Sequence, residues 1–218
     1  MKPTIIWDFN GTLLNDMQVC VDCMNVLLSK RDLPLLGIER YREIFNFPVR
    51  QYYQELGFDF NREPFEIPAH QFIDLYREKL KDAPLHLETE ALLSHFHNMG
   101  FRQIILSAME QQFLEETLDQ KHITAYFDQI TGIRDHLGDG KLAMAKELLK
   151  GHENSRRNYL LIGDTIHDFE VARELGIHCI LVATGHQSYQ RLKALECKVL
   201  ERLDELRSEI PLWAAKNS

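Results

Sequence analysis

The sequence has no long hydrophobic run, no basic cluster and no low-complexity segment, and each of these absences excludes a class of protein. No apolar stretch approaches the roughly 20 residues that a membrane-spanning helix needs. The first residues lack the charged-then-apolar layout of a signal peptide. Lysine and arginine number 25 against 33 acidic residues, and no basic run exceeds two residues, whereas a nucleic-acid surface needs a dense basic patch. We therefore expect a cytoplasmic protein that binds neither membranes nor nucleic acids.

Cysteine is also scarce, with four residues in the chain. Cys20 and Cys23 have the spacing of a redox or zinc half-site, but they fall inside a helical pattern. They share a helix face with Val19, Val26 and Leu27, where cysteine behaves as a small hydrophobic residue. We predict buried structural thiols here rather than a redox or metal site.

What the sequence does contain is two kinds of pattern. With 218 residues and 44% apolar content, the chain can bury a full core as one domain or two small ones. Residues 16–82 read as helices throughout. From residue 83 onward, apolar strands alternate with helices, which is typical of a parallel sheet with crossover helices. The predicted strands cover residues 4–7, 101–106, 127–131, 159–162 and 178–182, with a strand stub and a helix over 199–210.

The first predicted strand ends in a carboxylate. Thr4 to Trp7 form an apolar, partly β-branched run, Asp8 interrupts it, and Gly11 and Thr12 follow as a tight turn. The carboxyl end of a strand is where open α/β sheets bind ligands. On this stretch alone, an aspartate that only satisfies the next turn is an equally good interpretation.

Four motifs in order break that tie, because together they resemble the haloacid dehalogenase superfamily, and in particular its phosphoglycolate-phosphatase-like branch. They are Asp8-Phe9-Asn10-Gly11-Thr12, Ser107 after an apolar strand, Lys141, and the acidic pair in Gly163-Asp164-Thr165-Ile166-His167-Asp168. The resemblance implies an α/β fold with a Rossmann-like parallel sheet core, formed by residues 1–15 and 83–218. It also implies that residues 16–82 are an inserted α-helical cap domain, which would exclude water from bound substrate.

The resemblance further implies the roles of individual residues. Asp8 would be the nucleophile, forming an aspartyl-phosphate that water then hydrolyses. The phosphoryl group would be held by Gly11, Thr12, Ser107, Ala108 and Lys141. The cofactor would be Mg²⁺, held by Asp8, the backbone carbonyl of Asn10 and Asp164, with Asp168 binding directly or through water.

Two of these assignments also follow from charge. Asp164 and Asp168 converging beside Asp8 would repel one another in a partly buried site, and a divalent cation resolves that conflict. A helix-capping role would explain Asp168 but not Asp164. Lys141, in the first turn of its helix, opposes the helix dipole, so we expect a carboxylate partner, either Asp8 or Asp139.

Gly140-Lys141 is not a phosphate-binding Walker loop. Asp135 stands where that loop needs its first glycine, and Leu142 stands where it needs serine or threonine. Nucleotide hydrolysis by that mechanism is therefore excluded.

Asn10 is the one departure from the family motif. The matching aspartate in family phosphatases protonates the leaving oxygen and then activates water, whereas an amide cannot exchange a proton near neutral pH. His167, inside the acidic motif, is a candidate to replace it. The family's dehalogenases also lack this acid, but they need no metal, which would leave Asp164 and Asp168 idle. A phosphonate hydrolase would need a cap lysine, for which Lys30 is a candidate by location.

The function that we expect is therefore Mg²⁺-dependent hydrolysis of a small phosphomonoester through an aspartyl-phosphate. The alternatives are a non-catalytic sensor of a phosphorylated ligand and a phosphonate hydrolase. The expected partner is a small phosphorylated metabolite, and the protein would be a monomer or a homodimer. Arg42 and Arg50 are candidate substrate-facing cations, although solvated helix surface is the favoured interpretation of each.

Overall fold

The sheet at the centre of the molecule is parallel throughout. The computed structural model describes residues 3–133 and 140–217. Within these residues, six strands pair side by side in the order β3-β2-β1-β4-β5-β6. The strands are β1 (Thr4–Trp7), β2 (Arg102–Glu110), β3 (Gln129–Ile133), β4 (Tyr159–Gly163), β5 (His178–Val182) and β6 (Lys198–Leu200). The predicted α/β fold with a parallel sheet is confirmed.

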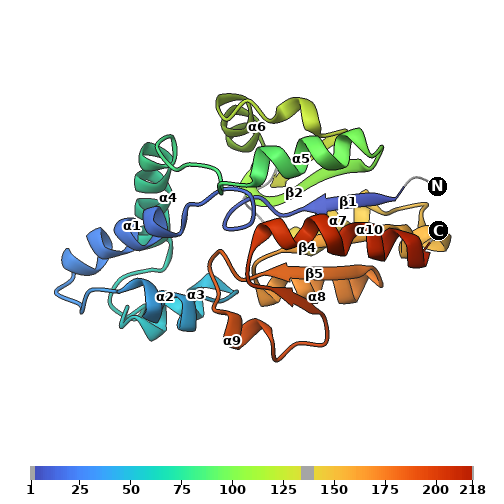
Figure 1. The fold of residues 1–218 in the computed structure, drawn as a ribbon. Helices are drawn as coiled ribbons and strands as arrows, with labels where there is room; N and C mark the ends of the chain where they lie inside the picture. The colour runs from blue at the N-terminus through green and yellow to red at the C-terminus, as the bar shows by residue number, and fades with distance from the viewer. Residues whose placement is uncertain (1–2, 134–139, 218) are drawn as a thin grey trace.

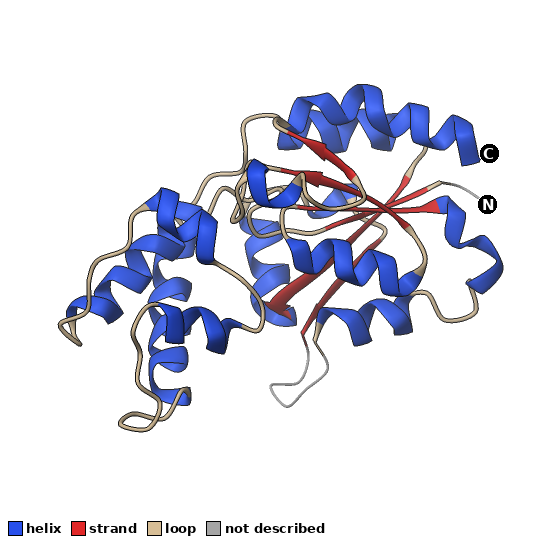
Figure 2. Cartoon of the chain, turned by 90° about the horizontal axis from the view of Figure 1, so that it is seen from below, coloured by secondary structure: helices blue, strands red, loops and turns tan. Residues whose placement is uncertain are grey.

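Helices cover both faces of this sheet (Figures 1 and 2). Side chains alternate along β1, so that Ile5 and Trp7 belong to one apolar cluster and Ile6 to another. The first cluster includes side chains of α5 (Thr89–Asn98), α6 (Gln111–Gln120) and α10 (Leu206–Asn217). The second includes side chains of α7 (Lys141–Leu148) and α8 (Ile166–Leu175). The remaining short elements are α9 (Tyr189–Leu192), η1 (Thr124–Tyr126), η2 (Glu153–Asn158) and η3 (Leu203–Glu205).

The strand boundaries match the predicted ones closely except in β2. The sequence predicts a strand that stops at Leu106, but β2 continues to Glu110 and carries Ser107 within it. Its register against β3 shifts between Leu106 and Glu110. The extension is possible because Ser107 and Met109 are both buried, so the polar serine does not mark the end of the strand.

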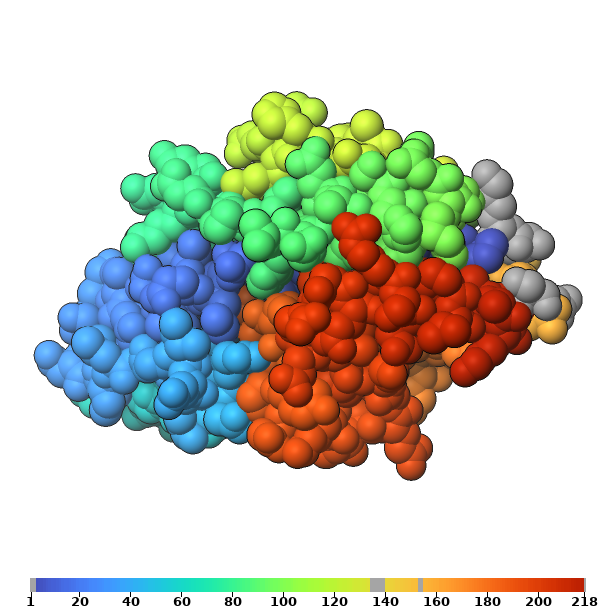
Figure 3. Space-filling model, in the orientation of Figure 1, coloured from blue at the N-terminus to red at the C-terminus, as the bar shows by residue number. Residues whose placement is uncertain are grey.

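Residues 17–80 form a group of helices with an apolar cluster of its own, which we call the four-helix segment. It lies beyond the carboxyl ends of the strands (Figure 1) and packs against the chain around α9 (Figure 3). Cys20 and Cys23 are buried in it as free thiols, as predicted. Its helices are α1 (Met17–Ser29), α2 (Ile38–Ile44), α3 (Val49–Glu55) and α4 (Glu66–Leu80). None of the helices in the described part of the chain is long and apolar enough to cross a membrane.

The two connections of the four-helix segment to the sheet run side by side. Leu14 and Leu85 form an antiparallel bridge. On either side of it, the backbone N–H of Asn15 donates to the carbonyl of Pro84, and that of His86 donates to the carbonyl of Leu13, each over 2.9 Å. The chain therefore enters and leaves the segment at one place.

Candidate active site

Polar side chains gather at the carboxyl ends of three neighbouring strands. Asp8 directly follows β1, Ser107 lies in the second half of β2, and Asp164 directly follows β4. All three side chains are buried. Because β1 lies between β2 and β4, the chain leaves β1 toward one side of the sheet first and toward the other side later. Such a switch point is where open α/β sheets bind ligands.

Lys141 connects two of the acids. It is the first residue of α7, and its buried ammonium donates to Asp8 and, over 2.5 Å, to Oδ1 of Asp168. Of the two partners considered for this lysine, Asp8 is in contact, whereas Asp139 lies outside the described residues. Burial opposes the charge, but the two carboxylates outweigh it and raise the pKa of Lys141, so the lysine is charged at neutral pH.

The carboxylates around Lys141 differ in their affinity for protons. Burial, followed by the neighbouring acids, raises the pKa of Asp8 to about 8, even though Lys141 acts in the opposite direction. Burial also raises the pKa of Asp164 to about 6. For Asp168, the charge of Lys141 outweighs burial and holds the pKa of the carboxyl below its usual range. The site therefore has more negative charge than the lysine alone can neutralise.

The donor set of this site suits Mg²⁺. Carboxylate oxygens of Asp8, Asp164 and Asp168 all lie within 4.8 Å of one another. Hard oxygen ligands are those that Mg²⁺ prefers in proteins. A divalent cation would also offset the excess negative charge of the three acids. The residues present therefore fit the ion that the sequence motifs imply.

Asp168 also has a structural task at the start of α8. Thr165 is the N-cap of that helix: its hydroxyl accepts from the backbone N–H of Asp168 over 3.3 Å and donates to Oδ2 of Asp168 over 2.6 Å. The backbone N–H of Thr165 donates to the same oxygen, over 3.1 Å, which completes a capping box. With Oδ1 held by Lys141 and Oδ2 by Thr165, Asp168 is better placed to contact a metal through water than directly.

The turn after β1 brings Gly11 and Thr12 against the acids. The Thr12 hydroxyl lies 3.3 Å from Oδ2 of Asp8 and 3.1 Å from Oδ1 of Asp164 and can donate to either. Gly11 has a φ of +76°, and a Cβ there would lie 2.6 Å from the His186 ring, so only glycine fits. Thr12 and Gly11 therefore keep the turn after β1 in close contact with Asp164.

Asn10 faces away from Lys141 toward the four-helix segment. Its amide nitrogen donates to Asp16 over 3.1 Å and to the Tyr76 hydroxyl over 2.6 Å, and its amide oxygen accepts from Ser107 over 3.2 Å. The hydroxyl of Tyr76 donates in turn to Asp16. The amide is thus fully hydrogen-bonded between the sheet and α4.

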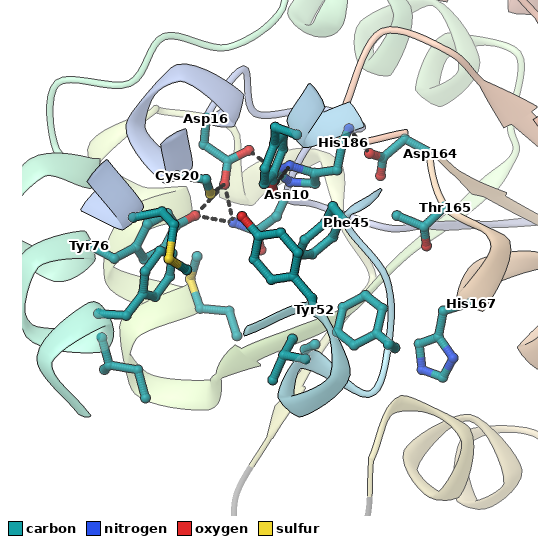
Figure 4. A pocket seen from close by; sticks show the side chains of 18 of the residues that line it. Asn10, Asp16, Cys20, Phe45, Tyr52, Tyr76, Asp164, Thr165, His167 and His186 are labelled. Carbon is teal, nitrogen blue, oxygen red and sulfur yellow. Dashed lines mark hydrogen bonds and ion pairs between the residues drawn. The ribbon is translucent and has the colours of Figure 1, made fainter. Parts of the chain in front are cut away.

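A second buried ion pair lies beside Asn10 (Figure 4). Nε2 of His186 lies 3.4 Å from Oδ1 of Asp16, and Nδ1 lies 2.8 Å from the Tyr41 hydroxyl. Burial would lower the pKa of His186, but the charge of Asp16 outweighs it and raises that pKa to about 9. The backbone N–H of His186 also donates to Asp164 over 2.6 Å. His186 therefore connects the loop after β5 both to Asp164 and, through Tyr41, to the four-helix segment.

The sequence did not single out Asp16, His186, Tyr41 or Tyr76. A signal for His186 exists, because Thr184-Gly185-His186 follows β5 at the same edge of the sheet as Asp8 and Asp164. Applying the strand-end rule to β5 as well would have found it. Asp16 stands at the N-cap position of α1, but its side chain makes no capping bond to that helix.

A cavity of about 330 Å³ opens between these groups and the four-helix segment. Asp8, Asn10, Ala108, Lys141 and His167 are among the residues that line it. His167 packs against the ring of Phe47 with 4.9 Å between ring centroids. All the predicted site residues named so far therefore lie in or directly behind one cavity.

The other candidate cations lie elsewhere. The guanidinium of Arg42 donates to the backbone carbonyls of Ala183 and Gln187, over 2.6 and 3.2 Å. Arg50 lies over the rings of Phe60 and Phe65. Neither lines the cavity, and Lys30 at the end of α1 does not line it either.

Comparisons with known proteins place these motifs in a family. A family model described as haloacid dehalogenase-like hydrolase matches residues 5–182. A phosphoglycolate phosphatase from Caulobacter vibrioides is 26% identical, over 84% of this chain and 80% of that protein. A 5'-nucleotidase from Pseudomonas aeruginosa is 24% identical, over 88% and 87%. Among solved structures, a haloacid dehalogenase-like hydrolase from Streptococcus pneumoniae superimposes with a TM-score of 0.83 at 17% identity, over 96% of this chain and 98% of that one, which shows the shared fold.

Proposed function

The chain belongs to the haloacid dehalogenase-like hydrolase family, and we propose that it is a phosphatase that hydrolyses a small phosphomonoester with the help of Mg²⁺. The observation that carries the proposal is the contact between Lys141 and Asp8 beside Asp164. A carboxylate at a strand end, a charged lysine and a metal-binding set of acids are what phosphoryl transfer to a carboxylate requires. The name of one curated relative, a phosphoglycolate phosphatase, agrees with this assignment.

In the first step, an oxygen of Asp8 attacks phosphorus. A bond forms between Asp8 and phosphorus, and the bond from phosphorus to the ester oxygen breaks, with its electron pair left on that oxygen. Lys141 stabilises the phosphoryl oxygens by its charge, and the Ser107 hydroxyl would exchange its hydrogen bond to Asn10 for one to a phosphoryl oxygen. Asp8, Asp164 and the backbone carbonyl of Asn10 would hold Mg²⁺, with Asp168 contributing through water. The bound ion would neutralise part of the phosphoryl charge.

In the second step, water attacks the phosphorus of the aspartyl-phosphate and releases inorganic phosphate and the free carboxylate of Asp8. Asn10 cannot supply a proton in the first step or take one in the second. The substrate's leaving oxygen must therefore depart as an anion or receive its proton from elsewhere. His167, which lines the cavity, is the candidate donor already named from the sequence.

We propose residues 16–82 as the cap domain over this site, with the core formed by residues 1–15 and 83–218. The position of the four-helix segment over the strand ends supports this role. The connections of the segment at Leu14 and Leu85 would be the hinge. The hydrogen bond from Arg42 to Ala183 would stabilise the closed position of the segment against the loop after β5. A closed cap would keep bulk water from the aspartyl-phosphate until the leaving group has gone.

The alternative reactions have less support. Within the described residues, Lys141 is the only lysine that lines the cavity, and it is paired with two carboxylates, so no lysine is free for the Schiff base of a phosphonate hydrolase. A dehalogenase would leave Asp164 without a task. A ligand sensor is favoured by Asn10 alone.

The test is release of inorganic phosphate from a panel of acyl, aryl and alkyl phosphates, with and without Mg²⁺. We expect turnover of at least one class, its loss on chelation of the metal and its return on adding Mg²⁺. Binding of phosphate esters without turnover of any of them would favour the sensor instead.

A further inference from the structure

The wall of the cavity opposite Lys141 is aromatic. It is formed by side chains of the four-helix segment, several of which are drawn in Figure 4. The rings pack mainly edge to face, as between Phe45 and Tyr52, or stacked, as between Phe72 and Tyr76. The rings that line the cavity on this side are those of Phe45, Phe47, Tyr52, Phe65, Phe72 and Tyr76.

Among the described residues, no arginine and no unpaired lysine lines the cavity. Its basic side chains are Lys141, His167 and His186. Lys141 is held by Asp8 and Asp168, and His186 by Asp16. His167 packs on Phe47, and Glu170 lies 3.8 Å from its ring. A carboxylate or second phosphate on the leaving group would therefore meet no permanently charged cation that is free to pair with it.

From these observations we propose that the substrate is the phosphomonoester of an uncharged aromatic alcohol, with its ring between the aromatic side chains of the four-helix segment. The proposal rests on the phosphatase function above and names its substrate class. A cavity of about 330 Å³ suits a phosphoryl group and one or two rings, since about 150 Å³ already accommodates benzene.

The chemistry at Asn10 agrees with this class. When Asp8 attacks phosphorus, the bond to the ring-bearing oxygen breaks and that oxygen keeps the electron pair. An aryl oxide is stable as an anion, so its departure needs no proton from residue 10. A small alkyl alcohol would leave as a far more basic alkoxide, and it would also leave the aromatic wall unfilled.

Binding can be tested separately from leaving-group chemistry. Three phosphonates serve as competitive inhibitors of acetyl phosphate hydrolysis: phenylphosphonate, methylphosphonate and phosphonoacetate. We expect phenylphosphonate to bind at least about tenfold more tightly than the other two.

Two variants of α4 test the position of the ring. Ala69 lines the cavity, whereas the neighbouring His70 is exposed. Ala69→Trp should abolish the preference for phenylphosphonate over methylphosphonate, and the matched control His70→Trp should keep it. Should Ala69→Trp fail to fold, Ile73→Arg adds a cation at a position that is 46% exposed and lines the cavity. It should shift the preference toward phosphonoacetate.

The outcomes distinguish the two proposals. Hydrolysis of acetyl phosphate with equal or tighter binding of methylphosphonate or phosphonoacetate would overturn the aromatic substrate and leave the phosphatase standing. If neither acetyl phosphate nor phenyl phosphate is hydrolysed, the phosphatase itself is wrong, and the substrate class falls with it.

Discussion

The amide of Asn10 donates a hydrogen bond to the carboxylate of Asp16 across 3.1 Å. Asp16 also accepts from the Gly11 backbone N–H and pairs with His186. Burial would raise the pKa of Asp16, but His186 and the hydrogen bonds outweigh burial and hold that pKa below its usual value. Asp16 is therefore charged. An aspartate at position 10 would place a second carboxylate against the first. The amide is therefore the neutral donor that a charged Asp16 needs.

This contact makes Asn10→Asp informative. The new carboxyl would share a proton with Asp16 or take one from solvent, because like charges so close raise the pKa of one of them. A protonated acid facing the cavity can protonate an alkoxide, and general acid catalysis is worth 10²–10⁴-fold. We expect the rate of ethyl phosphate hydrolysis relative to that of phenyl phosphate to rise at least about tenfold.

Asn10→Ala is the control for that ratio, since it supplies no acid. If His167 is the working acid, Asn10→Asp should change little, and His167→Ala should slow ethyl phosphate more than phenyl phosphate. Equal rates on both esters in the wild type, unaltered by any of these substitutions, would contradict this role for position 10.

Asp8→Asn should abolish turnover, because the amide is a poor nucleophile for phosphorus. We expect a fall of at least about a thousandfold in kcat with every active substrate. The fold should survive, since the substitution removes one of several mutually repelling acids, and circular dichroism with thermal melting checks this. A variant that kept a tenth of the wild-type rate would exclude Asp8 as the nucleophile.

Mg²⁺ should raise the melting temperature of the metal-free protein. Saturation a hundredfold above the dissociation constant stabilises by about 2.7 kcal/mol. Because burial raises the pKa of Asp8 to about 8 and that of Asp164 to about 6, protons compete with the metal at low pH. The shift at 10 mM Mg²⁺ should therefore be larger at pH 8 than at pH 5.5, as differential scanning fluorimetry would measure. Asp164→Asn should lose most of it, and an equal shift in that variant would remove Asp164 from the metal site.

The ion pair of His186 with Asp16 should make stability depend on pH. Burial would lower the pKa of His186, but Asp16 outweighs burial. The folded-state pKa is therefore about 9, above the usual 6.5. The pair therefore contributes fully below pH 6.5, and its contribution is lost as the pH rises through 9. We expect the free energy of unfolding to fall by on the order of 2–3 kcal/mol over this range. Urea denaturation of His186→Gln should show a flatter dependence, and superimposable curves would refute the pair's contribution.

Arg42→Ala tests whether the four-helix segment acts as a cap. The substitution removes the hydrogen bonds to the backbone of Ala183 and Gln187 and should loosen the closed arrangement. We expect KM to rise about five- to tenfold and limited proteolysis of residues 16–82 to become faster, since each such bond to a charged group is worth about 1.5–3 kcal/mol. Arg40, on the same helix, pairs with Glu55 inside the segment, so Arg40→Ala is the matched control. Identical KM values for the two variants would argue against closure.

The residues that could be identified from the sequence share a local signal. Asp8 and Asp164 each follow an apolar strand, and Lys141 stands where a helix dipole disfavours it, so the pattern within a few residues marks each as unusual. The alternation of strands with helices likewise predicted a parallel sheet, because each strand and each crossover helix has its own periodicity. The largest error was at the end of β2, since a buried serine reads as a break in an apolar run, and β3 lies two residues later in the chain than predicted.

The rest depended on contacts between distant parts of the chain. Asp16 and His186 are 170 positions apart, and nothing near either one indicates that its partner carries the opposite charge. Phe72 and Tyr76 lie four residues apart on α4 and stack on one another, but such spacing does not tell whether a helix face packs against a core or lines a cavity. That distinction depends on where the neighbouring helices lie.

The paired connections at Leu14 and Leu85 give the helical insertion a single two-stranded stem. Asn15 and Pro84 are joined by one hydrogen bond of 2.9 Å, so the sheet would meet the same two ends whatever lay between them. An exchange of the whole insertion for another of different length would leave β1 and its neighbours in place, as insertions at exposed, closely spaced ends commonly do. In the proposed function, bond breaking takes place at the strand ends and the four-helix segment selects the substrate, so replacing the segment would change the substrate without altering the residues that break the bond.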